Sequence, residues 1–392
     1  MNKVYIASAV RTPIGSFGGM FSKISATKLG SYAIKGALER AKISADKVEE
    51  VFMGNVVSAN LGQAPARQAA IFAGIPNTVP CTTVNKVCSS GAKSIMFGAQ
   101  SIMLGQRDIV VTGGMENMSQ IPYYVPNARF GYKFGNSDFV DGLQKDGLWD
   151  VYNECIMGVC ADKTASEHNI SREAQDEFAI KSYKLSAEST DKGYFKNEIV
   201  AVEVPQRRGE PLVIDEDEEY KSVKFDKIPN LRAAFSKDGT VTAANASTIN
   251  DGAAALVLVS QKAVDELGLQ PIAEIIAFTD AAHEPEWFTT APAKATEDIF
   301  KMTGKTTADI DYYEVNEAFS VVPLVYNQLV GVDPEKVNVL GGSVSLGHPL
   351  GASGARIVTT LTNVLQLKDG TTGLAAICNG GGGASAIMIR KV

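Results

Sequence analysis

Two stretches of the chain, one in each half, repeat the same short pattern. The segment VNKVCSSGAKSI at residues 84–95 is echoed by VNVLGGSVSLGHPLGASGARIV at residues 337–358. Both run from a strand that begins Val-Asn to a helix start that reads Ser-Gly-Ala followed by Lys or Arg. A second pair follows, DIVVTGGMENMS at 108–119 and GLAAICNGGGGAS at 373–385. Two similar halves of strand, turn, helix and strand predict a duplicated α/β fold.

The stretch between the repeats has a different character. Residues 120–249 are polar and contain the acidic run DEDEEY, the basic PQRRGE and a helical segment. We expect an insertion folded over one face, and we favour a lid or ligand-binding lobe over a solvated excursion because insertions this long are usually functional. We therefore expect an N-terminal domain over residues 1–267, which carries the insertion, and a C-terminal domain over residues 268–392.

Charge and composition exclude several classes of protein. With 44 acidic and 37 basic residues the net charge is −7, so no global positive field would hold the chain on nucleic acid or on an anionic membrane. No apolar run reaches the roughly 18 residues that span a bilayer, and no signal or transit segment precedes the first strand, VYIASAV. Five cysteines without framework spacing favour a reducing compartment. We expect the cytoplasm, although a processed mitochondrial matrix protein would look the same.

Cys88 lies between a predicted strand, CTTVNKV, and a predicted helix that starts near Ser89. The dipole and free N–H groups of a helix N-terminus lower the pKa of a thiol from about 8.5 to roughly 3.5–7.5. Such a thiol is a candidate nucleophile. A small buried apolar side chain is the commoner fate of a lone cysteine, so Cys88 alone does not decide between the two.

Cys378 takes the corresponding place in the second half, directly before NGGGGAS. Glycines there let the backbone approach a ligand and let N–H groups converge on an oxyanion. Neither this run nor GGSVSLGHPLGAS has the spacing of a P-loop or of a dinucleotide-binding loop. We therefore do not expect a nucleotide cradle in either stretch.

His348 is one of only three histidines and lies in a turn between Gly347 and Pro349. A neutral imidazole there could accept a thiol proton or donate to a developing negative charge, but a satisfied loop histidine fits the residue alone equally well. Asn316 follows a predicted strand, DYYEV, and could hold a donor over the same site, with Glu317 orienting it. The histidines and cysteines have no metal-ligand spacing, so no such centre is expected.

Taken together, these stretches resemble the thiolase family, in particular its biosynthetic acetyl-CoA C-acetyltransferases. The resemblance covers essentially the whole chain, in family order: VRTPIGSFGG, GNVVSANLGQAPARQAA, NKVCSSGAKS, GGMENMS, GTVTAANASTINDGAAAL, VNEAFS, GGSVSLGHPLGASGAR and CNGGGGAS. It implies a duplicated five-layer α-β-α-β-α fold with an inserted loop domain. It also implies reversible condensation of two acetyl-CoA to acetoacetyl-CoA and CoA through an acetyl-cysteine, by a homotetramer that is a dimer of dimers.

The resemblance assigns roles to the candidate residues. Cys88 would take the acyl group, His348 would remove its proton, and Cys378 would act as the second acid/base. Asn316, through a water, and His348 would form one oxyanion hole. The backbone N–H groups of Cys88 and Gly380 would form the other. Two thiols are needed because one is occupied by the acyl group. No cofactor is required, because the CoA thioesters are the substrates.

Contacts to coenzyme A are implied as well. The pantetheine arm would be contacted by Leu148, Met157, Ser247, Phe288, Ala318 and Phe319, and the nucleotide end would lie near Tyr183, Lys224 and Lys227. The lysines of KSVKFDK would supply the local positive charge that the acidic chain lacks. A solvated charged strand fits each lysine almost as well.

Two details connect the chain to the potassium-binding animal mitochondrial type, and two separate it from its relatives. AANAS and VSLGHP imply a potassium site made of Tyr183, Ala243, Ala244, Ala246 and Val344. Ile156 stands where many biosynthetic relatives have His in His-Met-Gly, and Thr289 stands where the mitochondrial type has Pro after Phe. We therefore do not expect acceptance of 2-methyl-branched acetoacetyl-CoA.

Three other functions compete. A degradative 3-ketoacyl-CoA thiolase of fatty-acid β-oxidation would share the catalytic residues and accept longer chains. A decarboxylating ketoacyl synthase would show a second active-site histidine in place of Cys378. A non-catalytic CoA or lipid carrier would not need Cys88, His348 and Cys378 together.

Overall fold

One continuous sheet runs through the middle of the molecule. The structure, a computed structural model, describes residues 2–392, and its ten-stranded sheet has the order β14-β15-β16-β13-β1-β12-β5-β3-β4, with β2 paired to β12. The strands of the first half are β1 (Val4–Arg11), β2 (Gly15–Ser16), β3 (Glu50–Gly54), β4 (Cys81–Val84), β5 (Ile109–Asn117) and β12 (Asn250–Ser260). Those of the second half are β13 (Ala273–Ala282), β14 (Tyr312–Val315), β15 (Thr372–Asn379) and β16 (Gly383–Lys391).

The two halves of the sheet have the same connectivity. In the first half β3 pairs with β5 in parallel, whereas β5 with β12 and β12 with β1 are antiparallel. In the second half β14 pairs with β15 in parallel, whereas β15 with β16 and β16 with β13 are antiparallel. The halves join where Tyr5 of β1 pairs with Glu274 of β13. The internal repeat of the sequence is therefore also a repeat of topology.

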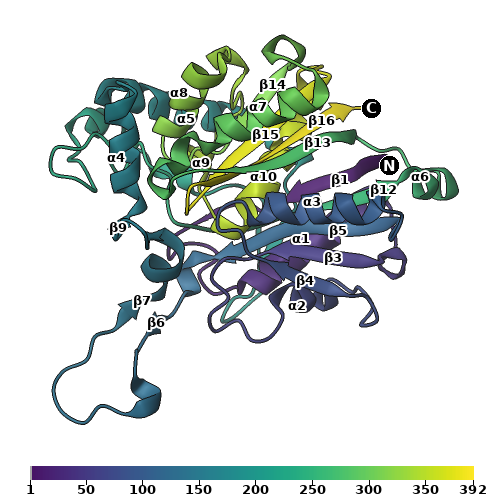
Figure 1. Ribbon diagram of the computed structural model, residues 1–392. Coiled ribbons are helices and arrows are strands. Elements are labelled where there is room, and N and C mark those ends of the chain that lie inside the picture. The colour runs from purple at the N-terminus through teal and green to yellow at the C-terminus, as the bar shows by residue number, and fades with distance from the viewer. Residues whose placement is uncertain (1) are drawn as a thin grey trace.

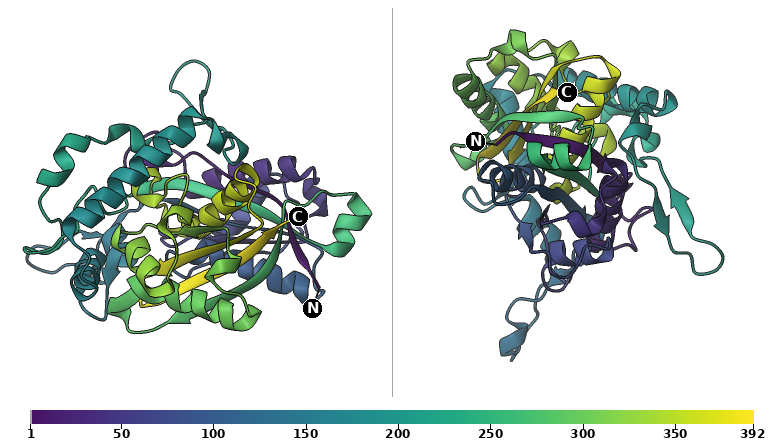
Figure 2. Two further views of the ribbon diagram at one scale, coloured as in Figure 1. Left: turned by 90° about the horizontal axis from the view of Figure 1, so that it is seen from above. Right: turned by 90° about the vertical axis from the view of Figure 1, so that its right-hand side faces the viewer.

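Helices cover both outer faces of the sheet and fill the space between its halves (Figures 1 and 2). They are α1 (Ala26–Ala41) and α2 (Pro65–Phe72) outside the first half, α7 (Ala291–Thr303) and α8 (Val321–Val330) outside the second, and α3 (Ser90–Met103) and α10 (Leu350–Leu367) between them. Three hydrophobic cores result, one under each outer pair and one around α3 and α10. The layers thus run helix, sheet, helix, sheet, helix.

Strands in the middle of this arrangement bury both faces. Val110 of β5 belongs to the central core, while its neighbour Val111 belongs to the outer core of the first half. Ala375 and Ala376 of β15 divide in the same way between the central core and the outer core of the second half. Strands that are covered on both sides have near-continuous apolar runs, which explains why VYIASAV and DIVVTGG do not alternate.

The repeated Ser-Gly-Ala marks the contact between the two central helices. A Cβ atom on Gly91 of α3 would lie 2.6 Å from the backbone nitrogen of Ala355 in α10, and one on Gly354 would meet the backbone of Ala92. Only glycine lets the two backbones come this close. The motif therefore fixes how the halves dock and where the N-termini of both helices meet.

The helices of the insertion pack on the second half of the molecule, whereas Val202 and Val204 join the outer core of the first half. These helices, α4 (Met157–Glu167) and α5 (Arg172–Asp191), contact α8 and the short α9 (Ser343–Leu346). Three two-stranded sheets accompany them: β6 (Tyr123–Tyr124) with β7 (Val140–Asp141), β8 (Trp149–Asp150) with β9 (Cys155–Ile156), and β10 (Val202–Val204) with β11 (Leu212–Ile214). The segment between β6 and β7 projects far from the body (Figure 1). The last helix of the first half is α6 (Gln261–Leu267). Within residues 2–392, no helix is both long and apolar enough to cross a membrane.

Candidate active site

A cavity of about 510 Å³ opens where the insertion meets the N-terminal ends of the two central helices. Its wall is mostly apolar, as is usual for a site that binds a small molecule. The residues named from the sequence that line it are Cys88, Leu148, Ile156, Met157, Ala243, Ala246, Ser247, Phe288, Ala318, Phe319 and His348, whereas Asn316, Cys378 and Gly380 do not line it. The cavity therefore brings together residues from both halves and from the insertion.

A tight turn presents Cys88 to this cavity. Val87, directly before it, has φ 48°, a left-handed conformation that is rare for a β-branched residue. The turn is held by Ser90, whose hydroxyl accepts from the backbone of Lys86 at 2.9 Å and donates to the carbonyl of Val87 at 2.6 Å. Such strain persists only where the surroundings enforce it, and it often marks functional positions.

The expected lowering of the Cys88 pKa is wrong for this site. The thiol lies two residues before the start of α3, and it is buried. Burial raises its pKa to about 12, while hydrogen bonds from the backbone of Gly380 and of Cys88 itself act against this rise. Desolvation penalises the thiolate more than the helix terminus stabilises it. Cys88 is consequently a neutral thiol at rest, and it needs a base to become a nucleophile.

Cys378 lies at the end of β15, close to Cys88. The hydroxyl of Ser89 donates to the side-chain oxygen of Asn379 at 3.0 Å and approaches the carbonyl of Ile377 at 3.3 Å. The two residues that flank Cys378 are thus tied to the residue that follows Cys88. Burial raises the pKa of Cys378 well above its ordinary value, and the proximity of Cys88 raises it further.

His348 lines the cavity, and the buried side chain of Asn316 faces it from behind the cavity wall. The Nδ2 atom of Asn316 lies 3.5 Å from Nε2 of His348, and the other ring nitrogen, Nδ1, lies 2.6 Å from the hydroxyl of Ser353. The imidazole is fully buried, which lowers its pKa to about 3, with a further contribution from the charge of Arg356. The ring is therefore neutral and keeps a lone pair with which to accept a proton.

Glu317 does not orient Asn316, contrary to the expectation from the sequence. Its carboxylate accepts from Ser182 Oγ at 2.8 Å, Asn338 Nδ2 at 2.8 Å and the backbone of Val344 at 3.0 Å. It thereby holds α9 against α5. Side-chain hydrogen bonds follow the direction in which a residue leaves its strand, and neighbouring positions point to opposite sides.

The residues predicted near the nucleotide end of coenzyme A do not line the cavity. Tyr183 is buried beside Val344, and its ring packs edge-on against Phe225 at a centroid distance of 6.4 Å. Lys224 and Lys227 are exposed on the loop of the insertion that contains Phe225. The structure thus gathers the predicted pantetheine contacts in one cavity and leaves the predicted nucleotide contacts outside its walls.

Glu116 is a residue of the site that the sequence did not single out. Its buried carboxylate accepts from the backbones of Val56 and Gly351 at 2.9 Å each and from Asn55 Nδ2 at 2.8 Å. Burial raises its pKa to about 7, and these hydrogen bonds counteract the rise. Glu116 fixes the start of α10 directly after His348. The sequence did offer a clue to Glu116, because it lies in GGMENMS, one of the stretches that carry the family resemblance.

Among residues 2–392, no group of three or more histidine, cysteine, aspartate or glutamate side chains is placed to hold a metal ion. The potassium ligands expected from the sequence at Ala243, Ala244 and Ala246 are of another kind, backbone carbonyls. They belong to a turn in which the backbone of Ala246 donates to Thr242 O at 3.1 Å, and the Asn245 side chain accepts from the backbone of Thr242 at 2.7 Å.

Comparison with known proteins identifies relatives over the full length. The family model described as thiolase, N-terminal domain, matches residues 4–262, and the one described as thiolase, C-terminal domain, matches residues 269–391. The chain is 56% identical over 391 residues to an acetyl-CoA acetyltransferase of Schizosaccharomyces pombe, covering 100% of this chain and 99% of that protein. It is 54% identical to the cytosolic acetyl-CoA acetyltransferase ERG10 of Gibberella zeae, covering 99% and 98%. Identity to the mitochondrial acetyl-CoA acetyltransferase of Danio rerio is also 54%, covering 100% and 92%.

A solved structure has the same fold. The crystal structure of Acat5 thiolase from Ascaris suum in complex with coenzyme A superposes with a TM-score of 0.95 at 48% identity, covering 100% of both chains. This match confirms the duplicated, layered α/β fold that the internal repeat and the resemblance predicted.

Proposed function

The chain belongs to the thiolase family, and we propose from the geometry of its site how it acts as an acetyl-CoA acetyltransferase. It condenses two molecules of acetyl-CoA to acetoacetyl-CoA and CoA, and thiolysis is the same path reversed. The observation that carries the mechanism is that the thiol of Cys88 and the neutral imidazole of His348 line one apolar cavity, with the buried thiol of Cys378 close to Cys88. The Ascaris suum relative was solved in complex with coenzyme A, and we propose that coenzyme A enters this cavity with its pantetheine arm.

In the first half-reaction, His348 removes the proton of Cys88 as the sulfur attacks the thioester carbonyl. The raised pKa of the thiol means that proton transfer must accompany attack, because the free thiolate is scarce at neutral pH. Backbone N–H groups of Cys88 and Gly380 stabilise the oxyanion. The bond to the CoA sulfur then breaks, and the leaving thiolate takes the proton of Cys378. The site now holds acetyl-Cys88, an imidazolium and the Cys378 thiolate.

In the second half-reaction, a new acetyl-CoA enters and the Cys378 thiolate takes an α-proton. A thiol whose pKa is raised by burial is a strong base once deprotonated, as removal of a weakly acidic proton requires. Asn316, through a water, and His348 stabilise the enolate oxygen. The enolate carbon attacks acetyl-Cys88, the bond to Cys88 breaks, and the Cys88 thiolate recovers its proton from His348. Cys88, His348 and Cys378 are then back in their starting protonation states, with the α-proton on Cys378 and the original Cys378 proton on the released CoA.

The test is acetylation of a single thiol. Intact-mass spectra after exposure to acetyl-CoA should show one added acetyl group in the parent protein and none in Cys88→Ala. Labelling that persists in Cys88→Ala would move the nucleophile elsewhere. Comparing acetoacetyl-CoA with 3-ketohexadecanoyl-CoA in thiolysis separates this activity from that of a degradative 3-ketoacyl-CoA thiolase, which would turn over the long substrate as well.

We propose a cytoplasmic homotetramer as the working form. Exposed aromatic side chains on the segment between β6 and β7, at Phe130, Phe134 and Phe139, support assembly, because a free apolar projection favours burial against another subunit. Relatives carry both cytosolic and mitochondrial names. Light scattering of the purified protein tests the mass of four chains, and fractionation of the source cells tests the compartment.

We also propose a potassium site at the turn of Ala243, Ala244 and Ala246. The fit is favourable, since neutral carbonyl oxygens suit a large monovalent ion. Glu219 lines the cavity together with Ala243 and Ala246. Burial raises the pKa of Tyr183, and the negative charge of Glu219 raises it further. Tyr183 packs with Val344, the remaining predicted ligand. A bound cation would supply positive charge beside Glu219 and would order this side of the CoA cavity.

A further inference from the structure

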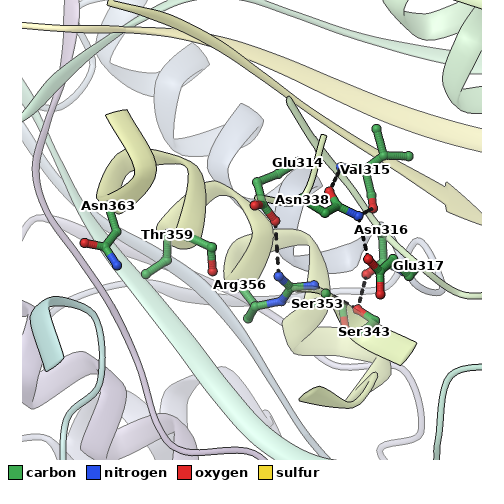
Figure 3. Close-up of polar contacts among 12 residues, drawn as sticks. Glu314, Val315, Asn316, Glu317, Asn338, Ser343, Ser353, Arg356, Thr359 and Asn363 are labelled. Carbon is green, nitrogen blue, oxygen red and sulfur yellow. Dashed lines mark hydrogen bonds and ion pairs between the residues drawn. The ribbon is translucent and has the colours of Figure 1, made fainter. Parts of the chain in front are cut away.

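We propose that Ser343 and Arg356, which do not line the cavity, are positioning residues that fix which atoms of Asn316 and His348 donate and which accept. Arg356 lies on α10 and is only 2% exposed. Its Nη2 donates to the hydroxyl of Ser343 at 2.8 Å, and its Nη1 donates to Glu314 Oε2 at 3.3 Å (Figure 3). The catalytic consequence of the inference rests on the proposed function, but the geometry does not.

The direction of the chain of hydrogen bonds is set at Arg356. A guanidinium carries donors only, so the Ser343 oxygen must accept from it. The hydroxyl hydrogen of Ser343 is then free to be donated to Oδ1 of Asn316, 2.7 Å away. With Oδ1 committed to Ser343, the amide nitrogen Nδ2 is the atom that faces Nε2 of His348 at 3.5 Å.

The same logic continues through the imidazole. Because Nδ2 of Asn316 is a donor, Nε2 of His348 must present a lone pair, and the ring proton resides on Nδ1. That proton is donated to the hydroxyl of Ser353 at 2.6 Å, and Ser353 donates in turn to the carbonyl of Pro349 at 2.9 Å. The chain begins at a group that can only donate and ends at one that can only accept. Only one arrangement of its hydrogens satisfies every member, and it leaves Nε2 as the base.

The first half of the fold shows that the residue after Ser-Gly-Ala does not have to be a fully buried cation. Lys93 occupies the position of Arg356 in the other Ser-Gly-Ala motif, and it reaches a half-buried Asp280 at 2.6 Å with its own side chain 21% exposed. Burying a guanidinium away from water is costly, so a fold that needed only a docked helix would have no reason to keep it. The cost is explained if the cation sets the tautomer of His348.

The experiment compares two serines of the same short helix. Ser343 and Ser345 are both fully buried in α9, but the Ser345 hydroxyl bonds Ser182 and Ser186 of α5 and takes no part in the chain to His348. Ser343→Ala and the matched control Ser345→Ala are labelled with ¹⁵N-histidine. The molecule has only three histidines, so His168→Gln and His283→Gln suffice to assign the His348 signals.

The parent and Ser345→Ala should show a single His348 tautomer with the proton on Nδ1. Ser343→Ala should show both tautomers, and its kcat for condensation should fall about 3- to 10-fold with little change in KM, the effect of one lost hydrogen bond. Arg356→Lys, which keeps a donor-only cation, should retain the Nδ1–H tautomer. A parent protonated on Nε2, or a Ser343→Ala protein with an unmixed tautomer, would overturn the inference. Because the tautomer is read without turnover, an absence of acetyl transfer in the parent would count against the proposed function alone.

Discussion

Ser89 donates a hydrogen bond to the side-chain oxygen of Asn379 across the junction of the two halves, at 3.0 Å. Ser89 follows Cys88 in the first half, and Asn379 follows Cys378 in the second. Both partners are buried. This bond between the two halves therefore helps to set the relative position of the two thiols, together with the close contact of α3 and α10.

Ser89→Ala should weaken both the fold and the chemistry. The change leaves Asn379 Oδ1 buried without this partner, which costs about 1–3 kcal/mol of unfolding free energy. It also loosens the spacing of the thiols, so condensation should fall more than acetylation of Cys88. Denaturant unfolding and the rates of both half-reactions measure the two effects.

Ser101→Ala is the matched control for that change. Ser101 lies on α3, the helix that follows the turn of Cys88. Its hydroxyl donates to Glu50 at 2.8 Å, away from the cavity. Ser101→Ala should lower the free energy of unfolding but leave the ratio of the condensation rate to the acetylation rate at the parental value. If Ser89→Ala and Ser101→Ala had equal ratios of the two rates, the hydrogen bond from Ser89 to Asn379 would contribute to stability but not to catalysis.

The raised pKa of Cys88 predicts an unusual pH dependence for its alkylation. With a folded pKa of about 12, the thiolate fraction keeps rising about tenfold per pH unit through pH 9. The rate of carboxamidomethylation by iodoacetamide, followed at Cys88 by peptide mass spectrometry, should therefore show no plateau between pH 6 and 9. In the denatured chain the same residue should begin to level off near its ordinary pKa of about 8.5. A plateau near pH 7 in the native protein would show instead that the N-terminus of α3 lowers the pKa of Cys88, as expected from the sequence.

Much of the fold could be predicted from short sequence patterns, namely the internal repeat and the two Ser-Gly-Ala motifs. The repeat predicted two halves of one topology, and the glycines of Ser-Gly-Ala were visible before their close contact was. The pKa of Cys88 was not predictable, because it depends on how completely the second half buries the thiol. The partner of Asn316 was also missed: Glu317 is its neighbour in sequence, whereas Ser343 and Arg356 reach it only through the docking of α9 and α10.

Replacing K⁺ by Na⁺ at constant ionic strength should lower activity. At the proposed site, the carbonyls of Ala243, Ala244 and Ala246 would hold the smaller ion less well, and the cavity wall that Ala243 and Ala246 share with Glu219 would become less ordered. The effect should appear mainly in KM for acetyl-CoA. Equal KM and kcat in the two salts would reject the site.

Cys378→Ser distinguishes the proposed mechanism from any simpler transfer through one cysteine. Serine is nearly the same shape, so a merely structural Cys378 would tolerate it with a modest loss of stability. A hydroxyl ionises far less readily than a thiol, however, and the site already raises the pKa of the group it holds there. Cys378→Ser should still form acetyl-Cys88, because the CoA thiolate can leave and take its proton from solvent, but it should lose condensation by about 10²- to 10⁴-fold, the contribution of a positioned acid/base.

The discriminating measurement is exchange of the methyl protons of acetyl-CoA with deuterated solvent. Exchange requires the α-proton to leave, whether or not a new carbon bond forms, so it reports on the base alone. It should disappear in Cys378→Ser and persist in Cys160→Ser, a control that changes a buried cysteine whose thiol contacts Cys155 and Asp150 and not Cys88. If Cys378→Ser exchanged these protons at the parental rate, the α-proton would be taken by His348 or by a bound water, and Cys378 would have no part in the chemistry.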